Sequence, residues 1–200
     1  MNLGQIVILN GAPRAGKSSI AAAIQETFEG VWLNLGLDNF KKMTPERYQP
    51  GIGLRPGGEA PDLEPIVVLL YRGMYEAIAA HSRLGVNVVA DTTHHDWYSV
   101  PRGILPQCAR IVAGLPALFV GVRCPLEVIL DRRRATWGPE MAEGRLPAVQ
   151  RFQDAVHVPG IYDVELDTST LSAAECAERV RQRLREGPAP TAFQQLAGMA

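Results

Sequence analysis

The segment Ile6-Val7-Ile8-Leu9-Asn10-Gly11-Ala12-Pro13-Arg14-Ala15-Gly16-Lys17-Ser18-Ser19-Ile20 decides the fold of this 200-residue chain. Its first four residues are apolar and mostly branched, which is typical of a strand buried on both faces of a parallel sheet. Residues 11–18 match the pattern GxxxxGK[ST], and residues 18–28 have helical character. A buried strand, a glycine-rich turn and a helix in this order predict a phosphate-binding loop, or P-loop.

The predicted loop assigns a role in binding ATP to three of its residues. Lys17 would neutralise the β- and γ-phosphates, the Ser18 hydroxyl would ligate Mg²⁺, and Ser19 would reach the α-phosphate. A glycine-rich turn without chemical function is disfavoured, because the strand and the helix stand where phosphate binding requires them. The predicted nucleotide-binding residues are Gly11, Ala12, Pro13, Arg14, Ala15, Gly16, Lys17, Ser18 and Ser19.

Composition excludes several classes of protein. The chain has 21 acidic and 20 basic residues and a net charge of -1, so it lacks the basic excess of a nucleic-acid-binding protein. No apolar segment has the length of a membrane span, and the N-terminus does not resemble a signal peptide. The three cysteines, Cys108, Cys124 and Cys176, form no CxxC pair, which favours a reduced protein without structural zinc. We therefore expect a cytoplasmic protein without a nucleic-acid or membrane partner; a homo-oligomer stays open.

Short apolar runs alternate with helical patterns, which predicts a three-layer α/β fold around a parallel sheet. The expected strands are 6–9, 31–35, 86–90, 117–124 and 163–166, and the expected helices include 66–84, 126–134 and 173–186, the last capped by Ser172 and Glu175. Long irregular segments are expected at 44–65 and 137–147. We predict one kinase-type domain over residues 1–186, with a lid at about 134–147 and a disordered tail at 187–200.

Two aspartates are expected beside the P-loop, because ligands gather at the carboxyl ends of parallel strands. Asp38 follows the second strand and is the candidate catalytic base for a hydroxyl acceptor; its alternative role is to cap a helix that starts at Asn39. Asp91 ends the third strand and is the candidate metal residue with Ser18, through a Mg²⁺-bound water; support of the acceptor site is a second functional role open to it. Its alternative role, equally favoured, is to cap the next helix.

The basic residues near the predicted lid are further candidates. Arg132, Arg133 and Arg134 end the helix after the fourth strand, and Arg145 follows in the loop. Spacing does not choose among the four, and we take Arg132 and Arg133, with Lys17, as catalytic cations for the transferred phosphoryl group. His94 and His95 are adjacent and should point apart, so they are poor metal ligands; one of them is a candidate for lining the substrate pocket.

Several blocks of the sequence resemble the chloramphenicol phosphotransferases. They are Ile8-Leu9-Asn10-Gly11 with Ala15-Gly16-Lys17-Ser18, Gly36-Leu37-Asp38, Val120-Gly121-Val122-Arg123-Cys124, and Val156-His157 with Tyr162 to Thr168. The resemblance implies a P-loop kinase fold with the five-strand order 2-3-1-4-5, ATP and Mg²⁺ as cofactors, and Asp38 as the base that activates the primary hydroxyl of chloramphenicol. The sequence departs from the family at residues 41–65, 92–101 and 136–139. The third of these segments stands where the family has its second lid arginine.

Three functions are therefore compared. The leading hypothesis is an O-phosphotransferase that acts on a small molecule and resembles chloramphenicol 3-O-phosphotransferase, with a role in antibiotic resistance. The second is a kinase of another metabolite or of a nucleotide-sugar, similar to gluconate kinase or zeta toxin. The third is an ATP-binding regulator without transfer activity. A guanine-specific GTPase is disfavoured, because the sequence lacks an Asn-Lys-x-Asp motif.

Overall fold

The computed structural model describes residues 2–138 and 146–199. Five parallel strands form one sheet in the order β2-β3-β1-β4-β5, which confirms the expected topology. The strands are β1 (Ile6–Asn10), β2 (Trp32–Asn34), β3 (Asn87–Thr92), β4 (Ala117–Arg123) and β5 (Val164–Asp167). Central β1 pairs with β3 on one side and with β4 on the other, and all five of its residues are buried. Burial on both faces explains why its sequence is a continuous apolar run.

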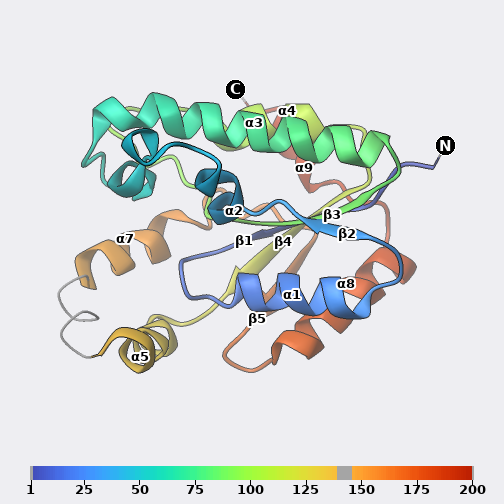
Figure 1. Cartoon of the computed structure of the whole chain (residues 1–200). Helices are drawn as coiled ribbons and strands as arrows, with labels where there is room; N and C mark the ends of the chain where they lie inside the picture. Colours follow the sequence, from blue (N-terminus) through green and yellow to red (C-terminus); the bar gives the residue numbers. More distant parts are fainter. Residues whose placement is uncertain (1, 139–145, 200) are drawn as a thin grey trace.

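Helices cover both faces of the sheet and make the three layers visible in Figure 1. One apolar core holds residues of α3, α4 and α9, and the other holds residues of α1 and α8. The helices are α1 (Lys17–Thr27), α2 (Leu37–Lys42), α3 (Glu64–Arg83), α4 (Ile104–Val112), α5 (Leu126–Trp137), α7 (Leu146–Ala155), α8 (Ala173–Glu186) and α9 (Ala192–Ala197). Among the described residues, none of the helices combines the length and the apolar character that a membrane span requires.

The predicted irregular segments are partly regular. Residues 44–65 contain three short 3-10 helices, η1 (Glu46–Tyr48), η2 (Gly51–Leu54) and η3 (Pro61–Leu63), before α3 begins. α5 continues three residues beyond the predicted end, to Trp137, so the predicted lid falls partly on this helix. Residues 139–145 of the predicted lid, including Arg145, lie outside the described residues, and its last two residues, 146 and 147, begin α7. The capping box of Ser172 and Glu175 at α8 is confirmed.

The prediction of a disordered tail was wrong. α9 lies in this tail, and three of its six residues are buried: Ala192, Phe193 and Leu196. They pack against α4 and β4, where the Phe193 ring lies 4.7 Å from the Phe119 ring. The two prolines before α9 form the connection from α8, and the apolar residues beyond them complete the core.

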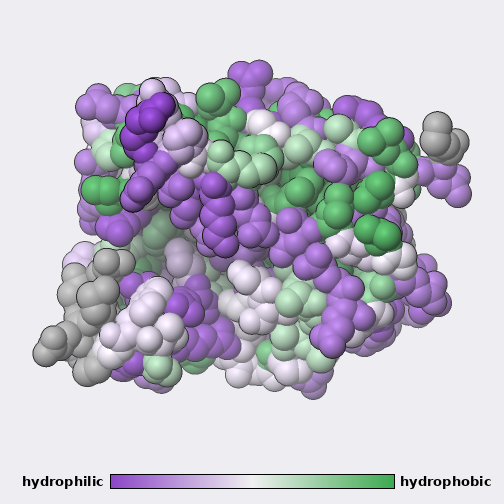
Figure 2. All heavy atoms as spheres, viewed as in Figure 1, coloured by the Kyte–Doolittle hydropathy of each residue, from purple (hydrophilic) through white to green (hydrophobic). Residues whose placement is uncertain are grey.

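Figure 2 draws all heavy atoms as spheres from the viewpoint of Figure 1. The face seen there is mostly polar, and apolar residues gather over β2 and the end of α3.

Candidate active site

The P-loop connects β1 to α1 and forms one wall of a large cavity. Arg14 and Gly16 adopt left-handed backbone conformations, with φ of 72° and 94°, and these turn the chain around the space that a phosphate would fill. Gly16 is the N-cap of α1 and supplies no side-chain hydrogen bond to the helix. The first N–H groups of α1 therefore have no capping side chain, and they are available to an anion.

Lys17 lies at the base of this loop and is only 6% exposed. Its ammonium group donates hydrogen bonds to the carbonyl oxygens of Gly11 at 2.8 Å and Ala12 at 2.9 Å. Burial lowers the pKa of Lys17 to about 8, although the charges of Asp91 and Asp38 act in the opposite direction. A polyphosphate would give this desolvated cation the opposite charge that it lacks, so the site favours an anionic ligand.

Ser18 and Asp91 meet beside Lys17, as the sequence predicted for a metal site. The Ser18 hydroxyl donates a 2.7 Å hydrogen bond to Asp91 Oδ2. Among the described residues there is no cluster of three or more metal-ligating side chains. Mg²⁺ does not need one, because it commonly binds one or two protein oxygens and takes phosphate and water oxygens for the rest. The pair therefore fits Mg²⁺ bound to a nucleotide. The alternative role of Asp91 as a helix cap was wrong, since α4 begins at Ile104 with Gly103 as its N-cap.

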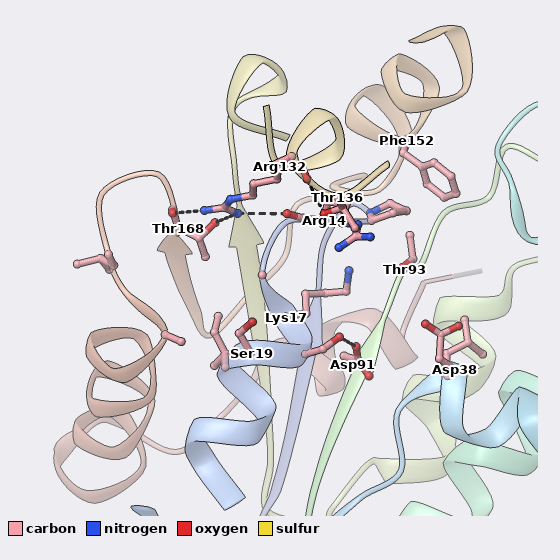
Figure 3. A pocket seen from close by; sticks show the side chains of 18 of the residues that line it. Arg14, Lys17, Ser19, Asp38, Asp91, Thr93, Arg132, Thr136, Phe152 and Thr168 are labelled. Atoms are coloured by element: carbon pink, nitrogen blue, oxygen red, sulfur yellow. Dashed lines mark hydrogen bonds between the residues drawn. The ribbon is translucent and has the colours of Figure 1, made fainter. Parts of the chain in front are cut away.

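Asp38 faces the P-loop from the opposite wall of the cavity (Figure 3). It lies in the first turn of α2, whose N-cap is Gly36, so the alternative prediction that Asp38 caps a helix from Asn39 was wrong. Its side chain is 77% exposed and forms a 3.1 Å ion pair with Lys41. Exposure keeps the carboxylate accessible to a substrate. Glu64, by contrast, is 1% exposed and accepts hydrogen bonds from Ser99 and Arg102, so it serves the fold.

The arginines of α5 differ in what they contact. Arg132 lines the cavity, but its guanidinium donates to the Arg14 carbonyl oxygen, to Cys124 Sγ and to both oxygens of Thr168. Arg133 is buried and packs against the Trp137 ring, 4.9 Å from its centroid. Arg134 forms an ion pair with Asp131 and does not line the cavity. The structure thus brings Arg132 to the cavity wall, whereas Arg133, predicted as a catalytic cation, and Arg134 do not line the cavity.

The cavity has a volume of about 930 Å³, at the upper end of the range for small-molecule sites, and has room for more than one ligand. One end is formed by the P-loop, α5 and the start of α8, and suits a nucleotide. The other end, called here the acceptor end, is formed by α2, η2, α3, α7 and the residue after β3. Its lining residues are Leu37, Asp38, Leu54, Tyr71, Thr93 and Phe152.

The two histidines lie behind the cavity and do not line it. His94 Nε2 shares a 2.8 Å hydrogen bond with the Tyr75 hydroxyl, and His95 Nε2 shares a 3.0 Å hydrogen bond with the Leu54 carbonyl oxygen. The prediction that one histidine lines the substrate pocket was therefore wrong, although they do point to different partners. Burial lowers the pKa of His94 to about 3, so this ring is neutral at physiological pH.

Asn10 is a residue that the sequence analysis missed. Its amide nitrogen donates to the Val156 carbonyl oxygen and to the Tyr162 hydroxyl, each at 2.9 Å. Its amide oxygen accepts from the His94 backbone N–H at 2.7 Å. Asn10 thus joins the start of the P-loop to the segments that follow β3 and α7. The available signal was its position between a buried strand and the P-loop, where a polar side chain needs buried partners.

The comparisons with known proteins agree with this geometry. The family described as chloramphenicol phosphotransferase-like protein matches residues 4–185. The chain belongs to this family. It is also 30% identical to "Putative O-phosphotransferase Rv2636" of Mycobacterium tuberculosis over 210 residues, which cover 96% of this chain and 88% of the relative.

Solved structures show the same fold. The APS kinase CysC of Mycobacterium tuberculosis, in complex with AMPPNP and APS, has a TM-score of 0.63 and 18% identity, and the match covers 93% of this chain and all of that one (100%). A sugar kinase from Janibacter sp. HTCC2649 has a TM-score of 0.58 and 18% identity, and the match covers 93% of this chain and 97% of that one. This member of the chloramphenicol phosphotransferase-like family is thus a phosphotransferase with a kinase fold that acts on a hydroxyl group.

Proposed function

We propose that the protein transfers the γ-phosphoryl group of ATP, with Mg²⁺, to a hydroxyl group of a small, uncharged molecule. One observation carries the proposal: Lys17, the Ser18–Asp91 pair and the exposed carboxylate of Asp38 all face a single cavity. This set supplies a phosphate cation, two oxygen donors for the metal, and a base. The protein's own residues can therefore perform each part of a phosphoryl transfer.

The proposed reaction uses Asp38 as the base. Bound MgATP supplies the phosphoryl group, and the acceptor oxygen bonds to the γ-phosphorus while the bond to the β–γ bridging oxygen breaks and ADP leaves with that electron pair. The Asp38 carboxylate takes the proton from the acceptor hydroxyl. The Lys17 ammonium group exchanges the carbonyl oxygens of Gly11 and Ala12 for phosphate oxygens, and Ser18 and Asp91 hold the metal.

The lining of the acceptor end supports an uncharged substrate. Four of its six residues present aliphatic or aromatic groups: Leu37, Leu54, Tyr71 and Phe152. None of the described residues that line this end is an arginine, a lysine or a histidine. A carboxylate or sulfate substrate would lose its hydration there without gaining an opposite charge. Neutral aromatic alcohols of the chloramphenicol type fit this lining better than gluconate does.

The direct test measures ADP release with chloramphenicol, other neutral aromatic alcohols and gluconate as acceptors. We expect turnover with a neutral alcohol and none with gluconate. Asp38→Asn should lower kcat by at least about 100-fold and leave ATP binding unchanged, because a general base acts in the chemical step. Asp62→Asn, at an exposed aspartate in η3 outside the cavity, is the matched control. Tight ATP binding without turnover on any acceptor would support an ATP-binding regulator and contradict the proposal.

A further inference from the structure

Arg14 is the unusual residue of the P-loop. It is the one residue other than glycine with a positive φ among residues 2–138 and 146–199. A side chain in this left-handed conformation is strained, and such strain is concentrated at functional sites. Glycine would relieve the strain at no steric cost. An arginine at this position therefore suggests a use for its side chain.

The guanidinium of Arg14 is held by stacking on an aromatic ring and not by hydrogen-bond acceptors. Its Cζ lies 4.1 Å from the centroid of the Trp137 ring, at the end of α5, and Arg133 packs against the same ring. A stacked guanidinium keeps its N–H groups free, because they point outward in the plane of the group. The Arg14 guanidinium donates no hydrogen bond to another described residue and forms no ion pair with one; the contact from Arg132 goes to the Arg14 carbonyl oxygen. Figure 3 shows the side chains of Arg14 and Lys17 projecting into the same part of the cavity.

Arg132 is the other described arginine that lines the cavity, and it is already engaged. Its Nη1 and Nη2 atoms donate to four protein acceptors, including the Thr168 carbonyl oxygen at 2.6 Å. To bind a phosphate, it would have to give up hydrogen bonds that fix α5 to the P-loop and to the end of β5. Arg14 has no such bonds to lose, so its donors are available to a ligand without rearrangement.

We propose that Arg14 is the catalytic arginine that donates to the oxygens of the transferred phosphoryl group, and that Trp137 is a positioning residue that holds Arg14 there. The proposal rests on the proposed function. As the acceptor oxygen bonds to the γ-phosphorus and the bond to ADP breaks, negative charge spreads over the equatorial oxygens. A fixed guanidinium next to Lys17 stabilises that charge, and the stack on Trp137 supplies the fixing. Arg132 then has a structural role: its side chain joins α5 to the P-loop.

The first test replaces Arg14 with glycine. The variant should unfold at the same temperature as the wild type or higher, because the backbone strain is relieved, whereas kcat should fall about 100- to 1,000-fold. A merely structural arginine would give the opposite pattern, with lower thermal stability and a kcat close to that of the wild type. Arg47→Gly is the matched control, since Arg47 also stacks on an aromatic ring, Tyr48, but does not line the cavity.

A binding measurement separates this proposal from the proposed function. Arg14 should contact the γ-phosphate, so the wild type should bind AMPPNP more tightly than ADP, and Arg14→Gly should remove that preference while retaining ADP affinity. This result needs no acceptor. If no acceptor is phosphorylated by the wild type, the proposed function fails, and the nucleotide preference still tests Arg14. An unchanged preference for AMPPNP in Arg14→Gly would overturn the role of Arg14.

Trp137 is tested through its coupling to Arg14. Trp137→Ala should lower kcat by about 10-fold, and Trp137→Phe should retain most of the activity because it keeps a ring for the stack. The double variant Arg14→Gly/Trp137→Ala should be no slower than Arg14→Gly alone, since Trp137 acts through Arg14. Additive losses in the double variant would refute the positioning role.

Discussion

The hydroxyl of Ser18, in the first turn of α1, donates a 2.7 Å hydrogen bond to Oδ2 of Asp91, near the end of β3. These residues are far apart in sequence, and they meet because β1 and β3 are neighbouring parallel strands with Leu9 opposite Asp91. The P-loop therefore begins beside the aspartate. The contact joins the proposed phosphate site to the proposed metal site.

Replacing Asp91 with asparagine should weaken the proposed Mg²⁺ site. The amide retains a hydrogen-bond acceptor for Ser18 but loses the negative charge that attracts the cation. The Mg²⁺ concentration for half-maximal activity should rise about 10- to 100-fold, with activity partly restored at high Mg²⁺. A titration of activity against Mg²⁺ at saturating ATP measures this. Asp154→Asn, at an exposed position of α7 that does not line the cavity, should leave the titration unchanged.

Gly36→Ala should disturb Asp91 by steric contact alone. The φ of Gly36 is -59°, which alanine adopts readily, but a Cβ there would lie 1.8 Å from Asp91 Oδ1. The carboxylate would have to turn away from Ser18. We expect a loss of about 1–3 kcal/mol in the free energy of unfolding, together with a higher Mg²⁺ requirement. Gly73→Ala in α3 is the control, because its Cβ would lie 3.5 Å from the nearest atom, a Phe40 ring carbon.

The binding of ATP should take up a proton at pH 8 to 9. The pKa of Lys17 is lowered to about 8 by burial, so in the free protein part of the ammonium is deprotonated in this range. A bound polyphosphate stabilises the charged form and raises that pKa, so protons are absorbed on binding. Calorimetry in two buffers with different ionisation enthalpies measures the uptake, which should vanish near pH 6.5. Lys17→Arg should show none at either pH, because the guanidinium stays protonated. Equal uptake in the variant would contradict the assignment.

Acid should destabilise the protein through two histidines, His94 and His157, whose pKa values are lowered in the folded state. Burial lowers the pKa of His94 to about 3 and that of His157 to about 4, below the usual value of about 6.5 in the unfolded chain. The unfolded state therefore binds more protons below pH 6.5, and the free energy of unfolding falls as the pH decreases toward the folded-state pKa. For His94 alone the loss between pH 7 and pH 5 is about 2 kcal/mol.

His94→Gln tests this assignment, because glutamine can still hydrogen-bond to the Tyr75 hydroxyl but does not titrate. Urea unfolding at pH 7 and pH 5 should show a smaller pH dependence for the variant than for the wild type. If the two proteins lose the same stability between these pH values, another group is responsible for the acid sensitivity.

Local features of the sequence were sufficient to predict the P-loop and its strand and helix, because each depends on a short, contiguous pattern. Asp38 and Asp91 could be placed near that loop because parallel strands bring their carboxyl ends to one edge. The stack of Arg14 on Trp137 could not be predicted, since it depends on how far α5 extends and on the backbone turn at Arg14. The partners of Asn10 likewise come from segments far away in sequence.

α9 should prove essential for stability, in contrast to the disordered tail that composition suggested. The Phe193 ring is 3% exposed and packs against the rings of Phe119 and Tyr75. Phe193→Ala should therefore lower the free energy of unfolding by about 3–5 kcal/mol, the cost of a large cavity in a core. Gln194→Ala, at an exposed position of the same helix, should change it by less than about 0.5 kcal/mol. Urea unfolding of both variants measures the difference. Tyr75 also shares a hydrogen bond with His94. The loss of packing in Phe193→Ala would therefore extend to the loop that contains His94, behind the acceptor end. A Phe193→Ala variant as stable as the wild type would show that α9 does not complete the core.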